Sequence, residues 1–383
     1  MSLITFAIMK CFVMPQLSKV PFLDVGATYV ELKVQIDHAV QRVLNSKSYI
    51  LGSEVAEFEN EYSNYVSADY CVGVANGLDA LNLALRAVGV GEADEVIVPS
   101  HTFIATWFAV TQCGARLIPV EPEIGGFNID PSLVESAITE RTKAIVVVHL
   151  YGQPAQLDEI LEIGKKYQIP IVEDAAQAHG ALYKGRKIGS HSDIVAWSFY
   201  PSKNLGAFGD AGAISTNNLD LAERVRCESN YGSKTKYHHE ILGTNSRLDP
   251  IQAAVLRVKL GILDEWNSRR VDVAKMYTTE LENLPLILPN WEFELQSVWH
   301  LFVVQVKNRD QLRDTLAKVG IETGIHYPIP PHLQLSYESE YGNLPLVRAE
   351  KISRSALSLP IGPHISIDMV RRVIDVLTES LSD

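Results

Sequence analysis

Residues 142–180 read TKAIVVVHLYGQPAQLDEILEIGKKYQIPIVEDAAQAHG, and this stretch holds the pattern that decides the fold. Two runs of apolar, mostly β-branched residues, 142–149 and 170–173, flank a helical pattern at 157–167. Continuous apolar strands joined by helices are typical of a parallel sheet that is covered on both faces. Such a sheet binds ligands beyond the carboxyl ends of its strands, so we expect functional residues in the turns that follow strands.

The same alternation extends in both directions along the chain. We expect further strands at 70–75, 95–99, 116–120, 194–198 and 212–216, and helices at 78–88, 102–113 and 131–138. Asp249-Pro250 is a helix-start signal, and a long helical stretch follows to about residue 284, with Gly261 as a possible break. Strands at 298–306 and 322–326 and helices at 310–319 and 367–379 complete the pattern. The sequence thus predicts an α/β chain, with a large, mostly parallel sheet domain at 15–258 and a smaller α+β domain at 259–383.

Composition and charge exclude several classes of protein. Of the 383 residues, 46% are hydrophobic and 21% are charged, as in ordinary globular proteins. The formal net charge of −12 argues against binding to nucleic acid or to an anionic membrane, because both need a basic protein surface. No run reaches the roughly 18 apolar residues of a membrane helix. Lys10 interrupts the apolar start at 3–14, so we expect no signal peptide and a cytoplasmic protein, with Met14 as a second candidate translation start.

The cysteines give no sign of a metal site or a disulfide framework. The four of them, Cys11, Cys71, Cys113 and Cys227, are far apart and form no CxxC pair. We therefore expect ordinary thiols and no bound metal.

The first candidate for chemistry is the acidic end of the strand at 170–173. Asp174 follows Glu173, and the residues after it are small. A carboxylate at the end of a buried strand needs a cationic partner to offset its desolvation. A helix-capping acid is the structural alternative, and a carboxylate that faces the cation of a ligand is the functional one.

The second candidate is Lys203, which follows the expected strand at 194–198 and lies among aromatic and small residues. Burial lowers the pKa of a lysine and makes its amine nucleophilic, as Schiff-base chemistry requires. The glycines that follow allow backbone to pass close to a ligand. An ordinary lysine in a surface loop is the alternative.

The third candidate is the junction of strand, turn and helix at Asn76-Gly77-Leu78. A helix N-terminus presents free N–H groups and suits a phosphate, although a plain connection between strand and helix is the simpler interpretation. The three features share one sheet edge and match the needs of pyridoxal 5′-phosphate. Its phosphate would bind at the helix N-terminus, its aldehyde would form an imine with Lys203, and its protonated pyridine nitrogen would pair with Asp174.

Three motifs carry a family resemblance: EDAAQAHG at 173–180, SFYPSKNLGAFGDAG at 198–212 and GTNSRLDPIQAA at 243–254. They resemble the DegT/DnrJ/EryC1/StrS family of sugar aminotransferases, which are pyridoxal phosphate enzymes of fold type I. The similarity runs from Val20 to about Pro363. Residues 230–249 look most like the subgroup that acts on dTDP-3-keto-6-deoxyhexoses, and Ser246 stands where much of the family has tyrosine.

The resemblance implies a role for each matching residue. Lys203 is expected to bind the cofactor as an imine and to move the proton, Asp174 to pair with the pyridinium nitrogen, and Gln177 to meet the pyridine hydroxyl. Further cofactor contacts are expected from Gly77, Leu78, Ser198, Phe103 and Asn245. Ser198 and the backbone of Gly77 and Leu78 would hold the phosphate, Phe103 would stack on the ring, and Asn245 would reach the cofactor of a partner subunit in a homodimer. Contacts to the sugar nucleotide are expected from Tyr183, His238, His239, Arg247, His326 and Tyr327.

The implied activity is transfer of an amino group from L-glutamate to C-3 of a dTDP-3-keto-6-deoxyhexose, for a surface polysaccharide or a glycoside. Amination at C-4 of a 4-keto-6-deoxyhexose is the alternative. A sugar dehydratase of the same fold would carry histidine in place of Lys203, and a non-catalytic regulatory homologue would not need Lys203, Asp174 and Gln177 together.

Overall fold

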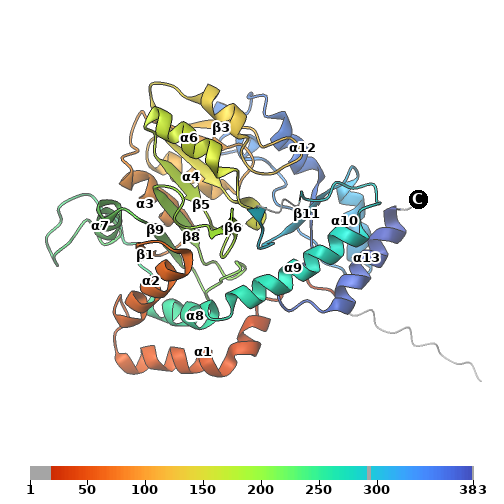
Figure 1. The fold of residues 1–383 in the computed structure, drawn as a ribbon, viewed down its shortest axis with the longest axis horizontal. Helices are drawn as coiled ribbons and strands as arrows, with labels where there is room; N and C mark the ends of the chain where they lie inside the picture. The colour runs from red at the N-terminus through yellow and green to blue at the C-terminus, as the bar shows by residue number, and fades with distance from the viewer. Residues whose placement is uncertain (1–18, 291–294, 382–383) are drawn as a thin grey trace, which may run out of the picture.

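The computed structural model describes residues 19–290 and 295–381, and its centre is a seven-stranded sheet (Figure 1). The strands lie in the order β1 (Tyr70–Val74), β9 (Gly212–Thr216), β8 (Ile194–Ser198), β5 (Ile171–Asp174), β4 (Thr142–Val148), β2 (Glu95–Pro99) and β3 (Arg116–Val120). All are parallel except β9, which is antiparallel to both neighbours. The predicted large, mostly parallel sheet is therefore confirmed. The apolar start at 3–14, Met14 and Cys11 lie outside the described residues.

Both faces of the sheet are buried, as the continuous apolar strands predict. Ile145 and Val147 of β4 belong to the core under α2 (Ser53–Val66), α6 (Leu157–Tyr167) and α8 (Pro250–Leu260). Ala144 and Val146 belong to the opposite core, under α3 (Gly77–Ala87), α4 (Ile104–Gln112) and α7 (Leu219–Glu228). Successive side chains of a strand point to opposite faces, so both sets must be apolar.

The C-terminal part is a smaller layer of helices on a two-stranded sheet. Its elements are α9 (Leu263–Glu280), β11 (Phe302–Gln305), α10 (Arg309–Lys318), η3 (Pro331–Leu333), α11 (Glu338–Tyr341), α12 (Val347–Ser355), β12 (Ala356–Leu359) and α13 (Ile367–Leu381). Phe302 and Leu357 lie in one core with Tyr277 of α9, and α9 runs from the large sheet into this layer (Figure 1). The domain boundary at residues 258 and 259 stays a prediction.

Several elements differ from the sequence-based expectation. The sequence-based expectation lacks the helices α1 (Ala27–Ser46), α2, α7, α11 and α12 and the strand β12. It also lacks the small sheet of β6 (Leu182–Tyr183), β7 (Arg186–Lys187) and β10 (Leu295–Gln296). The helix expected at 131–138 is two short turns, α5 (Pro131–Val134) and η1 (Glu135–Ala137). The strand expected at 322–326 is wrong, because Gly324 makes only an isolated bridge to Ser358. The strand expected at 298–306 shortens to β11.

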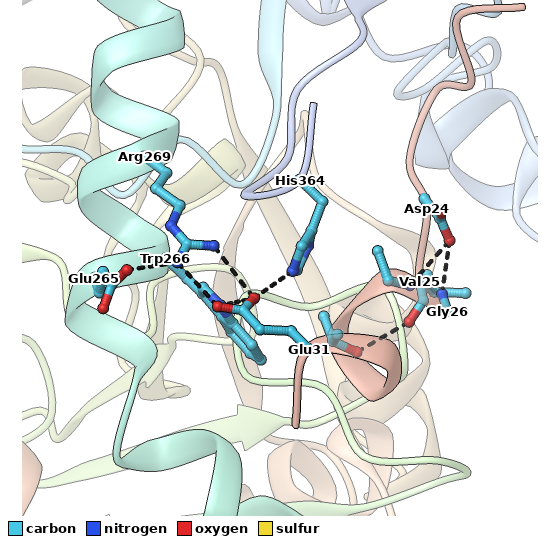
Figure 2. Close-up of polar contacts among 10 residues, drawn as sticks. Asp24, Val25, Gly26, Glu31, Glu265, Trp266, Arg269 and His364 are labelled. Carbon is cyan, nitrogen blue, oxygen red and sulfur yellow. Dashed lines mark hydrogen bonds and ion pairs between the residues drawn. The ribbon is translucent and has the colours of Figure 1, made fainter. Parts of the chain in front are cut away.

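Helix α1 is held by one cluster of polar groups around Glu31, which Figure 2 shows. The Glu31 carboxylate accepts hydrogen bonds from Trp266 Nε1 (3.0 Å), Arg269 Nη2 (2.9 Å) and His364 Nε2 (2.6 Å). Partial burial alone would raise the pKa of Glu31, but the Arg269, His364 and Trp266 donors lower it to about 2. Just before the helix, Asp24 Oδ1 accepts hydrogen bonds from the N–H groups of Gly26 (2.9 Å) and Ala27 (3.1 Å). The three contacts of Glu31 fasten α1 to α9 and to the segment before α13.

Among residues 19–290 and 295–381, no helix is both long and apolar enough to cross a membrane. Cys71, Cys113 and Cys227 are free thiols.

Candidate active site

Lys203 lies in the connection between β8 and β9, at the carboxyl end of β8. Its backbone N–H donates to the Tyr200 carbonyl (2.8 Å), while the Phe199 N–H donates to the Ala211 carbonyl (2.8 Å) and closes the loop. Burial lowers the pKa of the Lys203 amine to about 8, and the Asp174 carboxylate partly opposes this effect. A large share of the amine is therefore neutral, and thus nucleophilic, just above neutral pH.

Asp174 ends β5, the neighbour of β8 in the sheet, and only 6% of it is exposed. Its carboxylate accepts hydrogen bonds from Thr106 Oγ1 (3.0 Å) and from the Ala176 N–H (3.2 Å). Burial raises its pKa, and these two donors together with the charge of Lys203 only partly oppose that rise. Two neutral donors leave this buried carboxylate in need of a cation, which a protonated pyridine nitrogen supplies.

Gln177, Tyr327 and Phe103 gather beside Asp174. Gln177 Oε1 accepts a hydrogen bond from the Tyr151 N–H (2.7 Å), and Gln177 Nε2 donates to the Tyr327 hydroxyl (3.2 Å). The rings of Phe103 and Tyr327 lie 5.4 Å apart. Phe103 is 51% exposed although it is aromatic, which leaves its ring open to a planar ligand.

The predicted phosphate seat is formed where α3 begins. The Asn76 side chain caps the helix by accepting a hydrogen bond from the Asp79 N–H (2.9 Å). Gly77 packs on Ser198 so closely that a Cβ on Gly77 would lie 2.5 Å from Ser198 Cβ. The Ser198 side chain therefore stands beside the backbone of Gly77, at a helix N-terminus that suits an anion.

These residues fit pyridoxal 5′-phosphate. Three features lie at the ends of β8, β5 and β1: a lysine with a lowered pKa, a buried carboxylate that forms no ion pair with another described residue, and a helix N-terminus beside a serine. Lys203 would hold the aldehyde, Asp174 the ring nitrogen and Ser198 the phosphate.

A sequence profile of the DegT/DnrJ/EryC1/StrS aminotransferase family matches residues 30–378. The chain belongs to this family. It is 53% identical over 365 residues to the dTDP-3-amino-3,4,6-trideoxy-alpha-D-glucose transaminase of Streptomyces venezuelae, covering 94% of this chain and 96% of that one. It is 49% identical over 358 residues to the dTDP-3-amino-3,6-dideoxy-alpha-D-galactopyranose transaminase of Aneurinibacillus thermoaerophilus, covering 94% and 98%.

Solved structures agree. S. venezuelae DesV, in complex with a ketimine intermediate, superimposes with a TM-score of 0.93 at 52% identity, covering 94% of this chain and 98% of that one. NtdA of Bacillus subtilis, with bound cofactor PMP, superimposes with a TM-score of 0.89 at 33% identity, covering 97% of this chain and 87% of that one. The predicted fold type, the aminotransferase class and the pyridoxal phosphate cofactor are confirmed.

The structure of the aminotransferase brings His326 to this site as well. Its Nδ1 lies 2.8 Å from Ser358 Oγ, and its ring stacks on Phe22 with centroids 5.8 Å apart. Burial, with the charge of Lys203, lowers the pKa of His326 to about 4. The imidazole is therefore neutral at physiological pH and acts there as a hydrogen-bonding group rather than as a charge.

Other predicted sugar contacts lie elsewhere in the single chain. Tyr183 is buried on β6, and its hydroxyl accepts a hydrogen bond from the Asp158 N–H (3.1 Å) in the first turn of α6. His238 and His239 are exposed on the segment 231–245, where His239 Nδ1 lies 2.8 Å from the Tyr231 carbonyl. Among the described residues, no hydrogen bond joins these three side chains to Lys203 or Asp174. Their roles stay predictions.

Asn245 and Arg247 flank the buried Ser246. Ser246 Oγ accepts a hydrogen bond from the Ala75 N–H (3.0 Å), just before the phosphate seat. Arg247 Nη1 donates to Asn230 Oδ1 (2.9 Å), and Asn245 is exposed. The small Ser246 thus anchors the segment to the strand end that leads into the predicted phosphate seat, while the Asn245 side chain is exposed.

Sequence reasoning missed two residues of the site, Thr106 and Tyr151. Thr106 stands one helical turn after the expected Phe103, on the face that meets Asp174, and that spacing was the available signal. Tyr151 follows β4 in a turn at the carboxyl end of the sheet. Parallel sheets bind ligands beyond this end, and that position was the available signal.

Proposed function

We propose that this aminotransferase moves the amino group of L-glutamate to C-3 of a dTDP-3-keto-6-deoxyhexose and so forms a dTDP-3-amino-3,6-dideoxyhexose. One observation carries the proposal: the Lys203 amine with a lowered pKa stands near Asp174, in a chain 53% and 49% identical to two dTDP-3-amino sugar transaminases. We place the product in the synthesis of a surface polysaccharide or a glycoside.

The cofactor, when bound, supplies an aldehyde that takes up the amine and a ring that accepts the electrons released at Cα of the donor. Lys203 would bind the cofactor covalently, and its free amine would act as the general base and acid that moves the Cα proton of the donor. Asp174 keeps the proton on the ring nitrogen, because a neutral ring would accept those electrons poorly. Gln177 donates to the ring oxygen, Ser198 and the backbone of Gly77 and Leu78 hold the phosphate, and Phe103 covers the ring face.

The amine donor and the keto sugar use the same Lys203 in turn. We infer a homodimer in which Asn245 reaches the phosphate of the partner's cofactor. The exposed position of Asn245 supports this assignment, because an exposed side chain is available to a second subunit. Arg247, His238 and His239 lie on the same segment or at its end and are proposed to meet the anionic sugar nucleotide.

The decisive experiment incubates the purified enzyme with L-glutamate and each keto-sugar nucleotide, and locates the new amine by NMR. An amine at C-3 is expected. An amine at C-4 alone would replace the proposal with its alternative, a 4-aminotransferase. Lys203→Ala is expected to abolish turnover and change the absorbance of the bound cofactor, and an active Lys203→Ala enzyme would refute the assignment of the lysine.

A regulatory role is the second candidate, because a relative from Geobacillus stearothermophilus that is 41% identical is named a pleiotropic regulatory protein. A regulator without catalysis has no need of a lysine with a lowered pKa beside a buried carboxylate. Pure protein with absorbance at about 400–430 nm, which glutamate removes, supports the enzyme over the regulator.

A further inference from the structure

Tyr151 has an unusual backbone conformation at the edge of the active site. It lies in η2 (Leu150–Gly152), directly after β4, with φ 61° and ψ 9°. This is the left-handed region, which a residue with a bulky side chain rarely adopts. Only 4% of Tyr151 is exposed. A strained, buried residue beside a functional site persists only where its surroundings hold it there.

Two backbone contacts hold Tyr151 in this conformation. Its N–H donates to Gln177 Oε1 (2.7 Å), and its carbonyl accepts from the Leu301 N–H (3.2 Å). The next residue, Gly152, has no room for a side chain, since a Cβ there would lie 2.8 Å from the His300 N atom. The turn is therefore clamped between the segment that carries Gln177 and the segment 298–301.

The Tyr151 N–H settles which way the Gln177 amide points. A backbone N–H can only donate, so the amide oxygen must face Tyr151 and the amide nitrogen must face the other way. Gln177 Nε2 then donates to the Tyr327 hydroxyl (3.2 Å) and keeps a second N–H. That donor is what an oxygen on the cofactor ring requires.

The Tyr151 hydroxyl fixes a second part of the site. It donates to the His326 carbonyl, which can only accept. It lies 2.9 Å from His101 Nε2, so His101 must donate to it through that nitrogen. Burial lowers the pKa of His101 to about 4, which keeps the imidazole neutral. The backbone that carries His326 and Tyr327 is thus tied to the turn after β4.

We propose that Tyr151 is a positioning residue with two separable effects: its backbone N–H orients Gln177 toward the cofactor, and its hydroxyl places His326 and Tyr327 for the keto sugar. The second effect rests on the proposed function, whereas the first concerns the cofactor alone. The backbone of Tyr151 therefore affects the cofactor, whereas its side chain affects the binding of the keto sugar.

Three variants separate the two effects. Tyr151→Phe keeps the backbone and the ring but removes the hydroxyl. Tyr151→Gly adopts the left-handed turn without strain and keeps the N–H. Tyr151→Val resists the left-handed turn, because a β-branched residue is a poor occupant of it. The matched control is Tyr337→Phe, which removes the hydroxyl 2.7 Å from Thr111 Oγ1 in the core under α4.

Absorbance of the bound cofactor, recorded across pH, reports on Gln177 without any turnover. Tyr151→Phe, Tyr151→Gly and the control should match the wild type, while Tyr151→Val should shift the absorbance and its pH midpoint. The sugar half-reaction reports on the hydroxyl: Tyr151→Phe and Tyr151→Gly should raise KM for the keto sugar about fivefold or more, with the glutamate half-reaction changed less than about twofold.

Two results overturn the proposal. A Tyr151→Phe enzyme with an unchanged KM for the keto sugar removes the hydroxyl's role. If Tyr151→Val folds, an unchanged cofactor absorbance removes the backbone's role. If it does not fold, an altered absorbance in Tyr151→Phe, which keeps the backbone and the ring, does the same. Should no keto sugar accept an amine from the wild-type enzyme, the proposed function fails, and the absorbance series still decides the orientation of Gln177.

Discussion

Ser198 and Gly77 stand in direct contact across the ends of two strands, so that a Cβ on Gly77 would lie 2.5 Å from Ser198 Cβ and 3.0 Å from its hydroxyl. One residue ends β8, and the other begins α3. Because Gly77 has no side chain, the Ser198 hydroxyl stands beside the N-terminus of α3, where we propose that both meet the phosphate. The phosphate seat therefore depends on a contact between residues 121 positions apart in the sequence.

The first prediction concerns this contact. Gly77→Ala should displace Ser198 or the first turn of α3 and weaken pyridoxal phosphate binding by about tenfold or more, because each charge-assisted hydrogen bond to the phosphate contributes strongly. Titration of the cofactor-free enzyme, followed by absorbance, measures this. Gly91→Ala is the matched control, since a Cβ at Gly91 would have no atom of the described residues within 4 Å. Equal affinities of the two variants would count against the seat.

The second prediction is the pH dependence of cofactor capture. Only the neutral amine of Lys203 attacks an aldehyde, and its pKa is lowered to about 8. The capture rate should rise with pH through about 8 and then level off, whereas an ordinary lysine would keep gaining neutral amine to beyond about pH 10. Stopped-flow absorbance of cofactor-free enzyme mixed with pyridoxal phosphate measures the rate. A rate that still climbs steeply above about pH 9 would contradict the lowered pKa.

The third prediction tests the support of Asp174. Thr106→Val removes the hydroxyl that donates to Asp174 Oδ2, so the pKa of the carboxyl should rise further and its hold on the ring proton should weaken. We expect turnover to fall about tenfold, with Thr106→Ser restoring it. Asp174→Asn should retain some cofactor and lose most of the rate. Thr111→Val, on the same helix but bonded to Tyr337, is the control and should keep wild-type turnover.

The seven strands of the large sheet and the helices α3, α4 and α6 between them could be predicted, because the apolar runs there are continuous or strongly periodic. Helix α1 could not, since its buried face is narrow: Leu32 and Ile36 pack against Val255 and Trp266, while Val30 and Val34 stay exposed. A helix that lies on another helix, away from the sheet, carries a weak hydrophobic pattern. Its anchor, the polar cluster around Glu31, joins residues 235 and 333 positions apart.

Some residues of the candidate site could likewise be predicted from the sequence, and others could not. Lys203, Asp174 and Gln177 could be predicted because each lies in a motif directly after a strand. Tyr151 could not, because its role depends on a left-handed backbone and on a contact to His326, 175 positions away. Tyr183 shows the reverse case: its motif resemblance suggests a sugar contact, whereas its hydroxyl bonds to the first turn of α6.

The fourth prediction concerns stability. His149 Nδ1 accepts from the Ala155 N–H (3.0 Å), so its Nε2 carries the proton and donates to the buried Glu173 (2.7 Å). Burial would raise the pKa of Glu173, but His149 and the Ser192 N–H hold it below its usual value. Glu173→Ala leaves these buried donors unpaired and should lower the free energy of unfolding by about 3–5 kcal/mol at about pH 7, measured by urea denaturation.

The lowered pKa of Glu173 also decides how its contribution to the free energy of unfolding changes with pH. Its contribution is fully present above the unfolded value of about 4.5 and is lost as the pH falls through the folded value. The difference in free energy of unfolding between the wild type and Glu173→Ala should therefore become smaller below about pH 4.5. Asp272→Ala is the control, since it breaks only an exposed pair with Lys275 and should cost less than about 1 kcal/mol. A gap that widens in acid would show that the pKa is raised instead.

The fifth prediction tests whether two subunits share each site. Asn245 is exposed on its own chain, and we propose that it serves the partner's cofactor. Lys203→Ala and Asn245→Asp should each be nearly inactive, the latter because a carboxylate repels a phosphate. When the two variants are mixed and allowed to exchange subunits, half of the dimers are mixed, and each mixed dimer has one site with an intact Lys203 and an intact Asn245. About a quarter of wild-type activity should return. If Asn245 served its own chain, every site would lack one of the two residues, and the mixture would stay as inactive as its components.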